Sequence, residues 1–295
     1  MKKKIFTGAG VAIITPMCAD GSVNYDVLTE LLEFQIANST DAIVICGTTG
    51  EASALDDIEH LRTVEHAVKI TNGRVPVIAG TGSNDTRHCV ALSNEAKRLG
   101  VDALLQVTPY YNKTSQAGLI KHFLTVADDV DLPIVLYNVP SRTGVNIAPS
   151  TYVELAKHPM IVATKEASGN ISHIAKVAQL VGDQIAIYSG NDDQIVPIMS
   201  LGGSGVISVL SNVMPKETHN ICQLYLEGKT AESCALQLKL LNLIDALFCD
   251  VNPIPVKEAM NLMGYAAGEC RLPLCNMSDG NKALLKAEME KAGLL

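Results

Sequence analysis

Eight short apolar runs, rich in β-branched residues, recur along the chain at intervals of roughly 20 to 35 residues, close to the length of one strand-plus-helix unit. The runs are residues 11–14, 42–46, 75–79, 103–107, 134–137, 161–164, 185–188 and 206–209. The segments between them place apolar residues at helical spacing, as Val27, Leu31 and Ile36 do in the first. This alternation constrains the fold more than any other feature of the chain.

Strands that are apolar throughout and alternate with helices indicate a parallel sheet covered on both faces. Eight such units end near residue 225, which favours a closed barrel over an open doubly wound sheet. We therefore expect an α/β fold, with a (β/α)8 TIM barrel in residues 1–225. Residues 226–295 contain further helical segments at 231–248, 255–263 and 279–292, and we expect them to form a C-terminal helical extension.

Residues that favour helix ends lie where this division into strands and helices places the ends of helices. Asn24 and Asp56 precede helical stripes, and we expect Asn84 to begin another helix. Gly73 and Gly100 follow two stripes, where a residue of positive φ commonly ends a helix.

Composition excludes several classes of protein. The net charge is −8, and no basic cluster occurs beyond Lys2, Lys3 and Lys4, which argues against nucleic acid as the main partner. No apolar run reaches the ~18 residues of a membrane helix, and Gly8 and Pro16 interrupt the run that imitates a secretory signal. The eight cysteines include no C-x-x-C pair, so we expect reduced, mostly buried thiols, no metal site and a cytoplasmic protein.

The active site of such a barrel forms at the carboxyl ends of its strands. In chain order these positions hold Thr15-Pro16, Gly47-Thr48-Thr49-Gly50-Glu51, Gly80-Thr81-Gly82, Thr108-Pro109-Tyr110-Tyr111, Tyr137-Asn138, Lys165-Glu166, Ser189-Gly190-Asn191-Asp192 and Ser208. Hydroxyls, glycines and amides dominate, without the paired carboxylates of glycosidases or the His/Asp sets of metallohydrolases. The chain also lacks a G-x-G-x-x-G motif, and the glycines at 202–205 favour a tight turn over a phosphate site.

Lys165 follows an apolar strand directly. Burial disfavours the ammonium form of a lysine, and the neutral amine is the nucleophile that forms an imine with a carbonyl. The alternative is an ion pair with Glu166 or another acid at the rim of the barrel. The surrounding hydroxyls favour the nucleophile, since imine formation needs proton donors and acceptors but no further charge.

Two neighbouring positions each allow two interpretations. Tyr137 ends the strand beside that of Lys165, so its phenol can reach the lysine or can simply contribute to packing. Thr48 and Thr49 lie between glycines, in a loop that either binds a substrate carboxylate or is an ordinary turn.

Three motifs, in order and spanning nearly the whole chain from about Phe6, resemble the dihydrodipicolinate synthase family. They are Gly47-Thr48-Thr49-Gly50-Glu51, Tyr137-Asn138-Val139-Pro140-Ser141-Arg142-Thr143-Gly144 and Lys165-Glu166. The resemblance implies a Schiff-base lyase that condenses pyruvate with L-aspartate 4-semialdehyde in lysine and diaminopimelate biosynthesis. It implies no metal and no organic cofactor.

The resemblance also implies catalytic roles. Lys165 forms the Schiff base, and Tyr137 is the general acid and base, joined through Thr48 to Tyr111 in a proton relay. In this family the tyrosine matching Tyr111 comes from the neighbouring subunit, beside Tyr110. We therefore expect at least a dimer and, by resemblance, a homotetramer built as a dimer of dimers.

Substrate binding is implied in the same way. Thr49 holds the pyruvate carboxylate, Arg142 holds the carboxylate of the semialdehyde, and backbone groups of Gly190 and Ile207 line the pocket. Related lyases such as N-acetylneuraminate lyase usually lack the arginine, and a guanidinium binds a carboxylate through two hydrogen bonds. The alternative role for Arg142 is a surface or interface ion pair.

Two other functions remain open on the sequence. One is a sugar-acid aldolase of the same superfamily, and the other is a non-catalytic keto-acid-binding regulator on a barrel scaffold. Comparing turnover of the semialdehyde with that of sugar acids distinguishes the synthase from the sugar-acid aldolase. Trapping of an imine distinguishes both enzymes from the regulator.

One departure from the family pattern concerns feedback inhibition. The lysine pocket of inhibited members corresponds here to Ala52, Ser53, Leu55, Asp57, His60, Asn84, His88 and Tyr110. Sensitive members place a glutamate at the position of His88 and a histidine at that of Asp57. An imidazole binds an ammonium group poorly, so we expect weak or absent inhibition by lysine.

Overall fold

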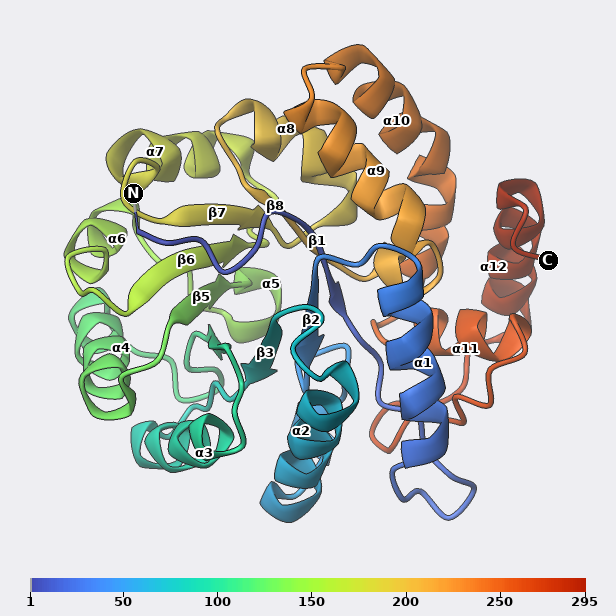
Figure 1. The fold of residues 1–295 in the computed structure, drawn as a ribbon, viewed down its shortest axis with the longest axis horizontal. Helices are drawn as coiled ribbons and strands as arrows, with labels where there is room; N and C mark the ends of the chain where they lie inside the picture. Colours follow the sequence, from blue (N-terminus) through green and yellow to red (C-terminus); the bar gives the residue numbers. More distant parts are fainter. Residues whose placement is uncertain (1) are drawn as a thin grey trace.

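Eight parallel strands close into a barrel whose spatial order is the order of the chain (Figure 1). The computed structural model describes residues 2–295. The strands are β1 Gly8–Ala12, β2 Ala42–Ile45, β3 Val77–Gly80, β4 Ala103–Val107, β5 Ile134–Asn138, β6 Ile161–Glu166, β7 Ala186–Ser189 and β8 Gly205–Ser208. The predicted (β/α)8 barrel is confirmed.

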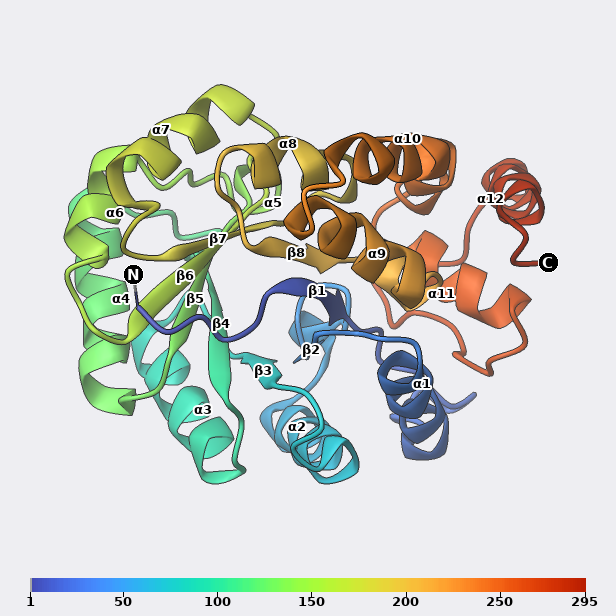
Figure 2. The ribbon, with the colours of Figure 1, turned by 45° about the horizontal axis from the view of Figure 1, so that its top comes forward.

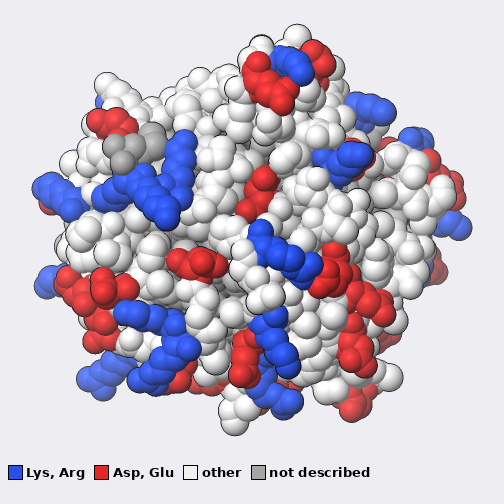
Figure 3. Space-filling model, in the orientation of Figure 1, with Lys and Arg blue, Asp and Glu red and all other residues white. Residues whose placement is uncertain are grey.

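Helices surround the strands (Figures 1 and 2). They are α1 Tyr25–Ala37, α2 Asp57–Thr71, α3 Thr86–Arg98, α4 Gln116–Val130, α5 Pro140–Thr143, α6 Pro149–Leu155, α7 Ile171–Val181, α8 Ile195–Ser200 and α9 Pro215–Leu226. None of the helices in residues 2–295 combines the length and apolar character needed to cross a bilayer. On the face drawn in Figure 3, basic and acidic side chains are interspersed and neither sign forms a continuous surface.

The remaining helices lie on one side of the barrel, and the first of them packs against α9 (Figure 2). They are α10 Thr230–Leu247, α11 Ile254–Leu262 and α12 Asp279–Ala292. Their buried side chains, among them Leu243 and Leu285, belong to the same hydrophobic cluster as those of the barrel helices. The boundary after residue 225 stays a prediction, because the core is continuous across it.

Several boundaries differ from the expected ones, and two of them bear on the argument. The first strand is Gly8–Ala12 rather than 11–14, because the ladder to β8 begins where Gly8 lies opposite Gly205. Asn84 does not begin α3: Asp85 caps that helix by accepting from the N–H of Arg87. The caps at Asn24 and Asp56 are confirmed.

The glycine segment before β8 forms a tight turn at the amino end of that strand, opposite the carboxyl ends where a barrel site forms. Gly205 has φ 142°, and a Cβ there would lie 1.8 Å from the carbonyl oxygen of Gly8. The β8–β1 ladder that closes the barrel therefore requires glycine at this position.

We predict that Gly205→Ala lowers the free energy of unfolding by about 3 kcal/mol or more, because the backbone strain and the clash add together. Gly202→Ala is the matched control, since Gly202 has φ 91° but a Cβ there would have no atom within 4 Å. Its cost should be only that of the positive φ, about 1 kcal/mol. Equal losses in urea unfolding would contradict the proposed closure constraint.

Candidate active site

Lys165 and Tyr137 lie side by side inside the barrel. The parallel register places Tyr137 of β5 opposite Lys165 of β6, and both side chains are buried. The Lys165 Nζ atom lies 4.4 Å from the centre of the Tyr137 ring. The neighbourhood expected from the strand order is therefore present.

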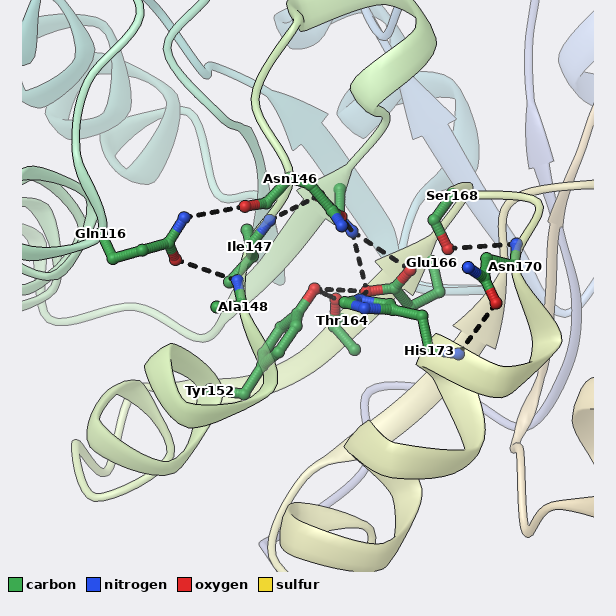
Figure 4. Close-up of polar contacts among 11 residues, drawn as sticks. Gln116, Asn146, Ile147, Ala148, Tyr152, Thr164, Glu166, Ser168, Asn170 and His173 are labelled. Atoms are coloured by element: carbon green, nitrogen blue, oxygen red, sulfur yellow. Dashed lines mark hydrogen bonds and ion pairs between the residues drawn. The ribbon is translucent and has the colours of Figure 1, made fainter.

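Glu166 points away from Lys165, to the outer face of the strand. It is fully buried, and it accepts hydrogen bonds from the Tyr152 hydroxyl and from Asn138 Nδ2 at 3.2 Å, with His173 Nε2 at 3.7 Å (Figure 4). Burial, and then the charge of Glu166, raises the pKa of Tyr152 well above its ordinary value. The alternative of a Lys165–Glu166 ion pair is therefore wrong, and within residues 2–295 no carboxylate lies within 4 Å of Lys165 Nζ.

Gly190, at the end of β7, leaves room for the lysine. A Cβ at this position would lie 3.1 Å from Lys165 Cε and 2.7 Å from Ala167 Cβ. Its N–H donates to the carbonyl of Glu166 at 2.7 Å. Ile207 of β8 is buried in the same interior cluster as Tyr137.

A cavity of about 520 Å³ opens beside Tyr137. Its lining includes Thr48, Tyr137 and Arg142, three of the residues expected to act in the site. Lys165, Thr49, Tyr111, Gly190 and Ile207 are not in its wall, so the expected set is divided between the cavity and other parts of the chain.

The two threonines after β2 face different surroundings. Thr48 is exposed and lines the cavity, whereas Thr49 is buried. The Thr49 Oγ1 atom accepts a hydrogen bond of 3.0 Å from Asn252 Nδ2. A Cβ on Gly50 would lie 3.2 Å from the Ile13 carbonyl oxygen, so the loop is as tight as its sequence indicates.

Arg142, in α5, is exposed and lines the cavity. Its Nη2 atom donates to the backbone carbonyl of Asn252 at 3.1 Å. Among the described residues it has no carboxylate partner within 4 Å, so the guanidinium is available to an anion.

Tyr111 stands apart from the other expected residues. Its side chain is 93% exposed, and its backbone has φ 68°, in the left-handed region. Tyr110 beside it is 37% exposed and lines the cavity. Within one chain, therefore, Tyr111 does not join Tyr137 and Thr48.

The cavity continues toward residues of the expected lysine pocket. His88 Nε2 is 2.9 Å from Asp57 Oδ1, and His88 Nδ1 is 3.0 Å from Ser83 Oγ. His60 is buried, and burial lowers its pKa to about 4, so its imidazole is neutral near pH 7. This part of the wall thus holds two imidazole rings and one carboxylate, and the carboxylate is already engaged by His88.

Sequence reasoning missed an ion pair that anchors the Thr48–Thr49 loop. Glu51 has φ 54°, and its Oε1 atom accepts from Lys257 Nζ at 2.7 Å while Oε2 accepts from the Arg271 N–H at 2.8 Å. The side chains of Glu51 and Lys257 are almost completely buried. No sequence signal links positions so far apart.

Two further expectations concern the cysteines and metal binding. Only three of the eight cysteines, Cys46, Cys89 and Cys222, are buried, so the expectation of mostly buried thiols is wrong. Burial raises the pKa of each of these three thiols, to about 11 for Cys89. Residues 2–295 contain no group of three or more His, Cys, Asp or Glu side chains arranged to hold a metal ion.

Comparison with known proteins identifies the family. The model of the dihydrodipicolinate synthetase family matches residues 5–292. The chain belongs to this family. A 4-hydroxy-tetrahydrodipicolinate synthase of Clostridium tetani is 57% identical over 99% of each chain, and that of Acetivibrio thermocellus is 54% identical over the full length of both.

Solved structures of the family superpose closely on the chain. The dihydrodipicolinate synthase of Aquifex aeolicus is 44% identical, with a TM-score of 0.96 over 98% of this chain and 99% of that one. The enzyme of Cyanidioschyzon merolae, solved with lysine bound, is 38% identical, with a TM-score of 0.97 over 99% of this chain and 100% of that one.

We predict that Lys257→Met lowers the free energy of unfolding by about 3–5 kcal/mol, because it leaves the Glu51 carboxylate buried without its partner. Lys157→Met is the control, since Lys157 pairs with Glu154 on the surface of the barrel. Urea unfolding measures both variants. A loss for Lys257→Met no larger than that for the control would contradict the anchoring role.

Proposed function

We propose that the chain is a 4-hydroxy-tetrahydrodipicolinate synthase, which condenses pyruvate with L-aspartate 4-semialdehyde in lysine and diaminopimelate biosynthesis. The observation that supports this most strongly is the buried Lys165 amine, which lies against Tyr137 and has no carboxylate of the described chain within 4 Å. Full-length relatives at 54–57% identity carry this name.

The proposed reaction begins with the amine of Lys165 as the nucleophile. The Lys165 amine adds to the pyruvate ketone, water leaves, and the resulting imine loses a methyl proton to become an enamine. The enamine carbon attacks the aldehyde of the semialdehyde and forms the new carbon–carbon bond. The amino group of the adduct then displaces Lys165 by transimination, which closes the ring and returns the free amine.

Proton transfer and substrate binding are assigned to the surrounding groups. Tyr137 is the general acid and base, and Thr48 connects it to Tyr111. Thr49 binds the pyruvate carboxylate, and the backbone groups of Gly190 and Ile207 line the pocket near Lys165. The lack of a side chain at Gly190 supports its place beside Lys165, because it leaves room for the lysine methylenes.

Arg142 binds the carboxylate of the semialdehyde. Its guanidinium lines the cavity and is not neutralised by an acid of the described chain. This arrangement favours an anionic amino-acid aldehyde over the polyhydroxyl chain of a sugar acid.

The proposed relay requires a second subunit. Tyr111 is almost fully exposed on the single chain, as expected of a residue that enters the site of a neighbour. We therefore propose a homotetramer built as a dimer of dimers, acting in the cytoplasm, with pyruvate and the semialdehyde as its partners.

Borohydride reduction in the presence of pyruvate tests the central step. We expect a single covalent adduct by mass measurement, and none with Lys165→Ala. Lys176→Ala, which removes a surface lysine of α7, is the control and should retain the adduct. An adduct that survives Lys165→Ala would overturn the proposal.

Arg142→Ala should raise the KM for the semialdehyde by about 10- to 100-fold, because it removes charge-assisted hydrogen bonds to the substrate. Imine formation with pyruvate should remain. Faster turnover of N-acetylneuraminate or 2-keto-3-deoxygluconate than of the semialdehyde would instead support a sugar-acid aldolase. Absence of any adduct with pyruvate would support the keto-acid-binding regulator.

We also propose that lysine inhibits this enzyme weakly or not at all, since His88 engages Asp57 where an ammonium group would need a free carboxylate. Titration of lysine to millimolar concentration should leave turnover nearly unchanged. The double variant Asp57→His/His88→Glu should acquire inhibition. Strong inhibition of the unmodified enzyme would contradict this prediction.

A further inference from the structure

Asn252 connects the C-terminal extension to two segments of the candidate site, the loop after β2 and α5. It lies between α10 and α11 and is only 6% exposed. Its side-chain Nδ2 donates to Thr49 Oγ1 at 3.0 Å, and its backbone carbonyl accepts from Arg142 Nη2 at 3.1 Å. One residue therefore contacts both side chains to which the proposed function assigns a substrate carboxylate.

The contact with Thr49 determines how the hydroxyl can be used. A threonine hydroxyl has one hydrogen to donate and two lone pairs to accept with. Because Asn252 Nδ2 donates to Oγ1, the hydroxyl hydrogen is directed elsewhere and is available to a carboxylate oxygen. An acceptor in place of Nδ2 would instead compete with the substrate for that hydrogen.

The oxygen of the Asn252 side-chain amide lacks a hydrogen-bond donor in the described chain. Asn252 Oδ1 is buried and accepts no hydrogen bond in the described chain. A buried acceptor without a donor costs free energy, so the amide is not placed here for its own stability. The bond to Thr49 is the one hydrogen bond that the Asn252 side chain makes in the described chain.

The contact with Arg142 has a related effect. A backbone carbonyl holds the guanidinium by a charge-assisted hydrogen bond without cancelling its positive charge. A carboxylate at this point would neutralise the arginine and compete with the aldehyde substrate. The extension therefore orients Arg142 and leaves its charge for the ligand.

We propose that Asn252 is a positioning residue that orients Thr49 for the keto-acid carboxylate and Arg142 for the carboxylate of the aldehyde. On this proposal the C-terminal extension takes part in substrate recognition as well as in packing. The inference rests on the proposed function, since it concerns the same two carboxylates.

The test compares pyruvate with acetone, a ketone that lacks the carboxylate, in borohydride trapping and, for pyruvate, in turnover. Asn252→Ala should raise the pyruvate KM and the half-saturating pyruvate concentration for trapping by about three- to tenfold. Trapping of acetone should not change. The KM for the semialdehyde should rise less, because the backbone carbonyl that holds Arg142 remains.

Asn252→Asp provides a second variant of nearly the same shape. Its carboxylate accepts the Thr49 hydrogen and repels the substrate carboxylate, so its pyruvate KM should exceed that of Asn252→Ala. Asn261→Ala is the matched control, because Asn261 bonds to Gly268 within the extension and does not contact the site. It should leave both ketones unaffected.

A double-mutant cycle with Thr49→Val separates positioning from general damage. If Asn252 acts through Thr49, the two substitutions should be less than additive in pyruvate KM. Additive effects, an unchanged pyruvate KM in folded Asn252→Ala, or equal loss of acetone trapping would each overturn the inference. Absence of any pyruvate adduct in the unmodified enzyme would instead refute the proposed function on which it rests.

Discussion

Tyr137 stands opposite Lys165 in the ladder between β5 and β6, and Asn138 stands opposite Glu166. Because side chains alternate along a strand, the first pair projects into the barrel and the second projects outward. A slip of β6 by one residue would put Glu166 opposite Tyr137, so that a carboxylate would lie where the amine now lies. The register of these two strands therefore separates the buried amine from its neighbouring acid.

The outer pair stabilises this register. Glu166 is buried, its hydrogen-bond donors come from β5 and α6, and His173 of α7 lies 3.7 Å from it (Figure 4). Removing any of these donors leaves a buried carboxylate partly unpaired, which is far more costly than losing the bond alone. The polar network outside the strand and the aromatic contact inside it depend on the same few backbone positions.

Patterns within about one βα unit are sufficient to predict the eight strands, most helix ends and the neighbourhood of Lys165 and Tyr137. The first strand is misplaced because the apolar run at 11–14 extends into the loop leading to the site, whereas the ladder uses Gly8 and Gly10. Asn252, Lys257 and Arg271 cannot be predicted as partners of the Thr48–Glu51 loop. Their contacts cross about 200 residues, and local periodicity contains no information about such distances.

The pair between Glu51 and Lys257 spans 206 positions of the chain. At a synthesis rate of about 5–20 residues per second, roughly 10 to 40 s separate the appearance of the two side chains on the ribosome. During that interval the loop that carries Thr49 has neither its ion pair nor its amide partner. A nascent or shortened chain can thus contain the lysine and the tyrosine while the loop beside them lacks every partner that the last helices provide.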